Sequence, residues 1–242
     1  MADRTDGDGR LAGRPAFPMV ILAGGQNSRL TVLSGTIYKP FLPINGMSFV
    51  ARQVARAALA GIADVTVIVD TPDPLIGEYV RLLREDPRYV VDVSLLCVEG
   101  DQARKLTEYS RSTSSRLPVV VCNGDTYVHY DPIALAQAAQ VEGVDSAILV
   151  AEYRLPFGVV SVVNGRAAGF DEKPNVGYKV STGQLAVGPE AFRLMSDGMD
   201  LAATLSTLAF DGRLAVVEAG SSFVVIDSFD DVAAAHRSEI LQ

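Results

Sequence analysis

The feature that most constrains the fold is an alternation of short apolar runs with longer amphipathic segments. In the first half of the chain, runs of strand length cover residues 17–23, 64–69, 90–98 and 118–122. Between them, apolar residues recur with helical spacing over residues 48–60, 74–84 and 101–112. Strand–helix–strand units of this kind build parallel sheets covered by helices on both faces. The sequence therefore predicts an α/β fold, a Rossmann-like three-layer sandwich with a mostly parallel, mixed central sheet.

The pattern becomes more varied after residue 122. Helices are predicted over 132–141, 189–195, 200–210 and 229–240, and strands over 145–151, 158–163, 167–171, 180–187, 214–218 and 223–226. Asn164-Gly165 separates two of these strands and is a strong hairpin-turn signal. The chain contains no internal repeat or low-complexity linker, so we interpret residues 17–242 as a single catalytic domain. Residues 1–16 are polar and rich in Gly, Asp and Arg, and we expect them to form a flexible tail.

Composition excludes several classes of protein. The net charge of −8 is unlike that of a protein that binds nucleic acid through its phosphates. No apolar stretch reaches the roughly 20 residues that span a bilayer, and the first residues lack the apolar segment of a signal peptide. We therefore expect a cytoplasmic protein with no membrane partner. The two cysteines, Cys97 and Cys122, lie in apolar runs and are expected to be buried and reduced.

The first candidate binding element is the segment Leu22-Ala23-Gly24-Gly25-Gln26-Asn27-Ser28-Arg29-Leu30, directly after the first predicted strand. Loops at the carboxyl ends of parallel strands are where such folds bind ligands. Paired glycines let the backbone approach a phosphate closely, and Arg29 offers several donors to phosphate oxygens. The segment lacks the Gly-Lys-Ser/Thr ending of a Walker loop. A tight turn beside a solvated arginine would give the same pattern.

Two further elements carry single charged residues in constrained settings. Lys39 lies in Tyr38-Lys39-Pro40-Phe41, where prolines stiffen the chain, and it could reach a phosphate as a point charge. Asp125 follows the apolar run Val119–Cys122 through Asn123 and Gly124. Magnesium is held by one or two carboxylates together with substrate phosphates, and Asp125 stands where such a ligand is needed. An ordinary loop lysine and a turn or capping aspartate are the alternatives.

In the second half of the chain, two more groups of charged residues follow predicted strands. Asp171-Glu172-Lys173-Pro174 ends a strand and suits a sugar phosphate, with Lys173 for the phosphate and Glu172 for hydroxyl groups; a charged turn is the alternative. Asp227 follows the apolar run 223–226 and is the candidate for a second metal ligand. Asp230 and Asp231 fall in the first turn of the last predicted helix, where negative charge stabilises the helix, so they are interpreted as capping groups.

In this order, the five elements resemble those of the sugar-1-phosphate nucleotidyltransferases, over residues 18–240. Within that family the chain looks most like the heptose-1-phosphate guanylyltransferases, through Cys122-Asn123-Gly124-Asp125-Thr126-Tyr127. The resemblance implies a nucleotidyltransferase fold, a nucleoside triphosphate and a sugar 1-phosphate as substrates, Mg²⁺ as cofactor, and, from family habit, a homodimer. It implies catalytic roles for Arg29, Lys39 and Lys173, and metal binding by Asp125 and Asp227. The residues implied to bind the nucleotide are Leu22, Ala23, Gly24, Gly25, Asn27, Ser28, Asn123 and Gly124. Those implied to bind the sugar phosphate are Gly158, Glu172, Lys173, Thr182 and Gly183.

The chain departs from the family pattern at several points. Asn27-Ser28 replaces a Gly-Thr pair, Tyr38 replaces a proline, and Val98–Lys105 does not align with the glycine-threonine run that helps to recognise the base. GTP with a heptose or hexose 1-phosphate is the first expectation for the substrates. The alternatives are a hexose-1-phosphate transferase that uses dTTP or UTP, a non-catalytic relative that binds nucleotide sugars, and a glycosyltransferase. For the last, the Asp-x-Asp triplet would have to be Asp6-Gly7-Asp8, in the predicted tail.

Overall fold

The computed structural model describes residues 17–24, 38–113, 118–155, 157–220 and 223–241. Its centre is a seven-stranded sheet in the order β10-β6-β9-β4-β1-β2-β3. The strands are β1 (Met19–Leu22), β2 (Asp64–Val69), β3 (Asp92–Cys97), β4 (Val119–Asn123), β6 (Ser146–Arg154), β9 (Asn175–Val187) and β10 (Leu214–Glu218). Only β9 pairs antiparallel with its neighbours, β4 and β6, and the other pairs are parallel. The predicted mostly parallel, mixed sheet is confirmed.

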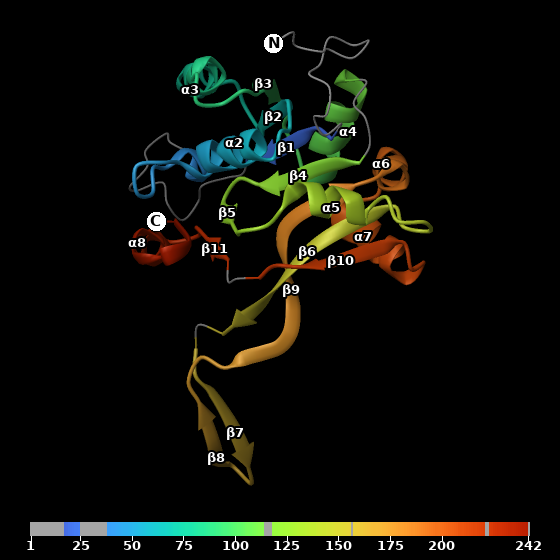
Figure 1. Ribbon diagram of the computed structural model, residues 1–242. Coiled ribbons are helices and arrows are strands. Elements are labelled where there is room, and N and C mark those ends of the chain that lie inside the picture. Colours follow the sequence, from blue (N-terminus) through green and yellow to red (C-terminus); the bar gives the residue numbers. More distant parts are fainter. Residues whose placement is uncertain (1–16, 25–37, 114–117, 156, 221–222, 242) are drawn as a thin grey trace.

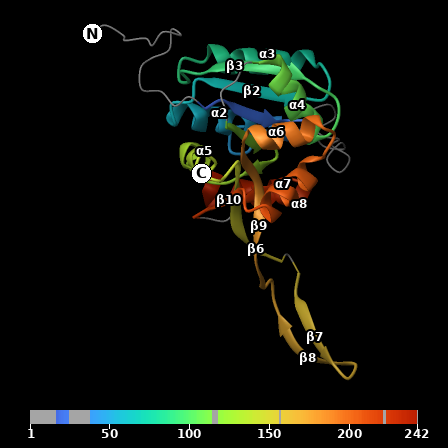
Figure 2. The same ribbon diagram turned by 90° about the vertical axis from the view of Figure 1, so that its right-hand side faces the viewer.

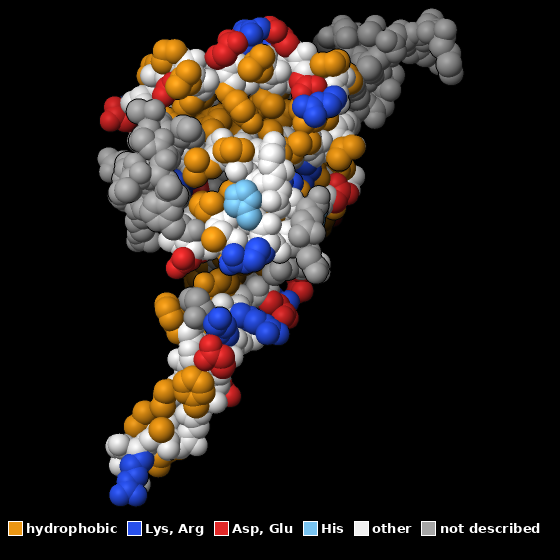
Figure 3. Space-filling model, turned by 90° about the vertical axis from the view of Figure 1, so that its left-hand side faces the viewer, with side chains coloured by type: hydrophobic (Ala, Val, Ile, Leu, Met, Phe, Trp, Pro, Cys, Tyr) orange, Lys and Arg blue, Asp and Glu red, His pale blue; other side chains and the backbone are white. Residues whose placement is uncertain are grey.

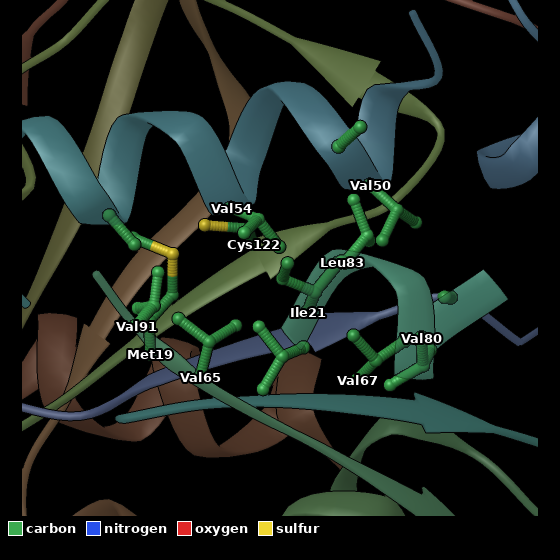
Figure 4. Close-up of a cluster of buried hydrophobic side chains, with 14 of the residues drawn as sticks. Met19, Ile21, Val50, Val54, Val65, Val67, Val80, Leu83, Val91 and Cys122 are labelled. Carbon is green, nitrogen blue, oxygen red and sulfur yellow. The ribbon is translucent and has the colours of Figure 1, made fainter. Parts of the chain in front are cut away.

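Helices cover both faces of this sheet, as Figures 1 and 2 show. One face packs against α2 (Phe49–Leu59), α3 (Pro74–Glu85) and α5 (Pro132–Ala138), and the other against α4 (Gln102–Ser112), α6 (Pro189–Ser196) and α7 (Leu201–Phe210). In Figure 4, Val50 and Val54 of α2 lie over Met19 and Ile21 of β1, and all four are fully buried. The predicted three-layer arrangement is therefore observed. None of the helices in the described part of the chain is long and apolar enough to cross a membrane.

Most predicted elements are present with shifted ends. The last helix, predicted over 229–240, is α8 (Phe229–Arg237) followed by a short 3-10 helix, η2 (Glu239–Leu241). Two short elements were not predicted: the 3-10 helix η1 (Lys39–Phe41) and the strand β5 (Thr126–Tyr127). The expectation for Cys97 was wrong, because its side chain is exposed. It ends β3, which is the edge strand of the sheet, whereas Cys122 in the central strand β4 is buried.

The Asn164-Gly165 turn joins β7 (Val159–Val163) to β8 (Arg166–Asp171). Both turn residues have positive φ, 51° and 75°, as the tight turns of two-residue hairpins require. In both ribbon views this hairpin projects away from the sheet as an extension of β6 and β9. Its valines and Phe170 are exposed, and they appear as the hydrophobic stripe along the projection in Figure 3. The sequence predicted the turn but not the direction of the hairpin.

Candidate functional site

Two aspartates far apart in the sequence are brought together by a short antiparallel pairing. Strand β11 (Val224–Val225) pairs with β5, with Val225 opposite Thr126. The pairing continues by one residue, because the Ile226 N–H donates to the Asp125 carbonyl oxygen at 3.0 Å. Asp125 immediately precedes β5, and Asp227 follows Ile226, so both carboxylates lie at the same end of this two-stranded sheet.

Lys39 joins this pair of carboxylates. It begins η1, whose next two residues, Pro40 and Phe41, are buried and hold the segment in place. The Lys39 Nζ donates to Asp227 Oδ1 at 2.7 Å, and only 13% of the lysine side chain is exposed. Burial raises the pKa of Asp125, the charge of Lys39 opposes that rise, and the negative charge of Asp227 adds to it. The three predicted residues therefore form one electrostatic group.

The backbone at Asp227 is fixed by the first turn of α8. Asp231 Oδ2 accepts hydrogen bonds from the N–H groups of Asp227 and Ser228 and from the Ser228 hydroxyl. The Asp231 N–H in turn donates to Ser228 Oγ, which completes a capping box. The interpretation of Asp231 as a capping group is confirmed. The same contacts hold Asp227 in position, so the cap also orients the site.

The chemistry of this group fits a magnesium ion. The lysine ammonium already lies beside both carboxylates, which shows that the site stabilises positive charge. Within the described residues no group of three or more His, Cys, Asp or Glu side chains converges. Two carboxylates are nonetheless sufficient for Mg²⁺ when substrate phosphates supply further oxygens. Asp125 and Asp227 are the residues that would hold it.

Close backbone contacts place the end of β1 in the same region. The Gly124 N–H donates to the Leu22 carbonyl oxygen at 2.9 Å. A Cβ atom at Gly124 would lie 2.9 Å from that oxygen and 3.0 Å from Pro40, so a larger residue would separate β4 from β1 and from η1. Gly124 therefore keeps Asp125 and Lys39 next to the carboxyl end of β1, where the predicted loop begins.

Beyond β1, the next strand contributes an ion pair that the sequence analysis missed. Asp70, directly after β2, accepts from Lys105 of α4 at 2.5 Å, and the two side chains are only 22% and 7% exposed. A Cβ atom at Gly24 would lie 2.6 Å from Asp70 Oδ2 and 2.7 Å from Lys105 Nζ. Asp70 comes directly after an apolar run of strand length, and the same kind of position marked Asp125. This position in the sequence could therefore have identified Asp70 as a candidate. Lys105 lies in a polar stretch of an amphipathic helix, and nothing in the sequence distinguishes it from a surface lysine.

This contact gives a testable prediction for Gly24. We expect Gly24→Ala to lower the free energy of unfolding by about 1 kcal/mol, because the new methyl group forces the ends of the paired Asp70 and Lys105 side chains to shift. Gly77→Ala is the matched control, since nothing lies within 4 Å of its added Cβ and it is within α3. That change should stabilise the protein by about 0.5–1 kcal/mol. Urea unfolding measures both, and equal stability of Gly24→Ala and wild type would contradict the contact.

A pocket of about 250 Å³ lies on the α4–α7 side of the sheet. There the Gln102 side chain donates to Asn123 Oδ1 at 3.1 Å, and the Asn123 amide lies against the Cα of Gly183, which has φ +76°. Asn123 and Gly183, predicted to contact different substrates, are thus neighbours. Thr182 is buried and donates to the Leu149 carbonyl oxygen, so its side chain faces the interior. The pocket is lined by Leu22, Gln102, Val121, Asn123, Ser181, Gly183, Leu185, Leu201, Ala202 and Leu205.

The other predicted sugar-phosphate residues lie at the base of the β7–β8 hairpin. A Cβ atom at Gly158 would lie 3.2 Å from Glu172 Oε2, so these two residues are neighbours, and Lys173 follows Glu172 with φ +48°. Glu172 and Lys173 are exposed, and Figure 1 shows the hairpin projecting beyond the ends of β6 and β9, away from β5 and β11. The structure does not bring them to the Lys39 group. Gly25, Asn27, Ser28 and Arg29 lie outside the described residues, and their roles stay predictions.

Known proteins share this fold. The structure of a putative glucose-1-phosphate thymidylyltransferase from Bacillus anthracis superposes with a TM-score of 0.73 at 19% identity, covering 92% of this chain and 94% of that one. The structure of HddC from Yersinia pseudotuberculosis gives a TM-score of 0.67 at 19% identity, covering 91% of this chain and 98% of that one. At these identities the likeness concerns the fold.

Comparison of the sequence with known proteins identifies the family of this chain. A mannose-1-phosphate guanyltransferase of Emericella nidulans is 26% identical over 185 residues, which is 72% of this chain and 50% of the relative. The chain thus spans about half the length of that curated relative. The family model described as nucleotidyl transferase matches residues 19–197, well over half of the chain. The predicted family is confirmed, and the protein with this Lys39–Asp125–Asp227 group belongs to the nucleotidyl transferase family.

Proposed function

We propose that the protein transfers a nucleoside monophosphate from a nucleoside triphosphate to a sugar 1-phosphate and releases pyrophosphate. The observation that carries this proposal is the convergence of Lys39, Asp125 and Asp227 beside the carboxyl end of β1. The mannose-1-phosphate guanyltransferase relative supports GTP as the donor and a hexose 1-phosphate as the acceptor. A heptose 1-phosphate is the acceptor that the sequence resemblance adds. We propose Mg²⁺ as the cofactor, held by the two aspartates.

The proposed reaction needs charge neutralisation and alignment more than proton transfer. A phosphate monoester loses its second proton near pH 6, so at neutral pH the acceptor oxygen is already ionised and needs no general base. That oxygen attacks the α-phosphorus, a new P–O bond forms, and the bond to the β-phosphate oxygen breaks in line with pyrophosphate leaving. Bound Mg²⁺ would neutralise charge on the phosphates. Lys39, held at Asp227, would add a second cation to the same oxygens.

Asn123 and Gly183 support the placement of the acceptor sugar. Both line the pocket behind Asp125, where Gln102 also offers polar atoms and Leu185 and Leu205 offer apolar surface. A sugar ring presents hydroxyl groups at its edge and C–H groups on its faces. The polar and apolar atoms that line this pocket match both kinds of group. The family motif supports the proposal that Glu172 and Lys173 contact the sugar phosphate.

The test is a measurement of pyrophosphate release with Mg²⁺ over a grid of substrates. GTP, dTTP, UTP, CTP and ATP are each combined with a panel of hexose and heptose 1-phosphates. We expect release that requires both substrates and stops when EDTA removes the metal ion. Absence of release in every combination, with nucleotide binding still measurable by calorimetry, would replace the proposal with that of a non-catalytic relative. Pyrophosphate release that does not require the sugar phosphate would instead indicate a nucleotide hydrolase.

A further inference from the structure

Strand β5, which begins directly after Asp125, is too short to hold its own position. It pairs with β11 over two residues, and a two-stranded sheet is marginally stable at best without further packing. This pairing nevertheless brings Asp125 and Asp227 together. The separation of the two proposed metal ligands therefore depends on what holds β5 in place, and helix α2 makes the contacts that can do so.

Arg56 of α2 stacks on β5. Its Cζ lies 4.6 Å from the centroid of the Tyr127 ring, in β5, and also 4.6 Å from the centroid of the Tyr130 ring. Arg56 Nη1 donates to Gln53 Oε1 at 2.9 Å, and Gln53 Nε2 in turn donates to the Thr126 carbonyl oxygen at 3.5 Å. Together, Arg56 and Gln53 contact both residues of β5.

The burial of Arg56 is not explained by packing alone. Its side chain is 8% exposed, and no carboxylate in the described part of the chain forms an ion pair with it. Burying a cation without a carboxylate costs free energy, and the attraction of two aromatic faces offsets only part of that cost. An apolar side chain of similar length at such a position often stabilises a fold as well or better. The planar, charged group therefore points to a role in orienting β5.

A second arginine extends the contacts of α2 to the Asp227 side. Arg52, one helical turn before Arg56, donates from Nη2 to the Leu241 carbonyl oxygen at 3.0 Å. Leu241 belongs to η2, which follows α8, and α8 begins two residues after Asp227. One helix thus contacts both the strand that follows Asp125 and the segment that carries Asp227.

We propose that Arg56 is a positioning residue for the proposed reaction: by stacking on Tyr127 it fixes β5, and so holds Asp125 at the distance from Asp227 that a shared magnesium ion needs. This inference rests on the proposed function. Arg56 acts through the ring of Tyr127 and not on the substrates. Loss of a group that orients metal ligands commonly lowers metal affinity or activity by about 10- to 100-fold.

Arg56→Met tests the proposal, because methionine keeps the apolar bulk of the side chain and removes the guanidinium. We expect the Mg²⁺ concentration for half-maximal pyrophosphate release to rise about 10-fold and kcat to fall, with the KM for sugar 1-phosphate unchanged. The melting temperature without metal should stay at or above that of wild type, because a buried charge without a carboxylate partner is gone.

Binding of Mn²⁺ gives a second measurement that needs no turnover, because Mn²⁺ also prefers oxygen ligands. We expect its affinity in the presence of GTP, followed by electron paramagnetic resonance, to fall in Arg56→Met by a factor similar to that for Mg²⁺. Arg193→Met is the matched control, because it removes an exposed arginine of α6, and it should behave as wild type.

A double-mutant cycle shows whether Arg56 acts through Tyr127. Tyr127→Phe keeps the ring and should retain the wild-type Mg²⁺ dependence, whereas Tyr127→Leu removes the ring and should reproduce the loss. Adding Arg56→Met to Tyr127→Leu should cause little further loss, because the contact is already gone. Arg56→Lys keeps the charge without the planar group, so it should show a weaker loss in the same direction.

Three results would overturn the assignment. Wild-type Mg²⁺ dependence and Mn²⁺ affinity in folded Arg56→Met, or in Arg56→Lys if the methionine variant does not fold, would limit Arg56 to packing. Losses of Arg56→Met and Tyr127→Leu that add fully in free energy would show that the arginine does not act through the ring. Both results leave the proposed reaction intact. Absence of Mn²⁺ binding by wild type would instead overturn the metal site, and this inference with it.

Discussion

Asp125→Asn is expected to abolish most turnover, lowering kcat by at least about 10²- to 10³-fold, the range seen when a single group that stabilises transition-state charge is removed. The asparagine keeps the size of the side chain and the Ile226–Asp125 backbone hydrogen bond, so the β5–β11 pairing should persist. What it removes is one of the two carboxylates proposed to hold Mg²⁺ at the α-phosphate. Pyrophosphate release at saturating substrates measures the effect.

Asp92→Asn is the matched control, because it makes the same chemical change on an exposed residue far from the carboxyl edge of the sheet. It should retain wild-type turnover. A circular dichroism spectrum of Asp125→Asn that matches wild type would confirm that the loss is chemical. Near-normal turnover of the folded variant over a range of Mg²⁺ concentrations would remove Asp125 from the metal site.

The same substitution should stabilise the protein in the absence of metal. Burial raises the pKa of Asp125, so the folded state binds its proton more tightly than the unfolded state does. Stability therefore falls as pH rises from about 4, the unfolded value, through the raised folded value, and the full penalty is present at neutral pH. Asparagine carries no such penalty. We expect the melting temperature of Asp125→Asn with EDTA to exceed that of wild type at pH 7, and the difference to shrink as pH is lowered.

The arrangement of β1 to β4 could be predicted because it follows from local periodicity. Buried runs such as 119–122 have strand length, and the carboxyl ends of parallel strands share one edge, which placed Asp125 correctly. The same logic applies to Asp70, which directly follows β2, although no family motif marks that position.

Other features could not be predicted from local signals. The pairing of β5 with β11 involves two residues from each strand, too few to give a periodic pattern, yet it decides that Asp125 and Asp227 meet. The burial of Lys105 depends on α4 packing against the end of β2, a long-range contact that helical spacing does not encode. The hairpin turn at Asn164-Gly165 was readable from its backbone requirements, but its orientation depends on the bulged, twisted ribbon of β6 and β9.

Lys39→Met should produce the second large effect, a loss of about 10²-fold or more in kcat with a smaller change in the KM for nucleotide. Methionine keeps the length and apolar stem of a side chain that is only 13% exposed, so the packing of η1 should survive. The ammonium group that balances Asp125 and Asp227 is lost. Because Lys39 would act on charge that develops as pyrophosphate leaves, its removal should affect the transition state more than the bound substrate.

A double-mutant cycle with Asp227→Asn separates the two roles proposed for Lys39. If the lysine only orients Asp227, the double variant should be no worse than Asp227→Asn alone, because its partner is already gone. If the lysine also contacts phosphate oxygens, the two losses should add in free energy, so that the fold-changes multiply. We expect the multiplied loss, because the ammonium group lies beside both carboxylates proposed to hold the metal ion, where the substrate phosphates would bind. A double variant with the activity of Asp227→Asn alone would limit Lys39 to holding the metal ligand.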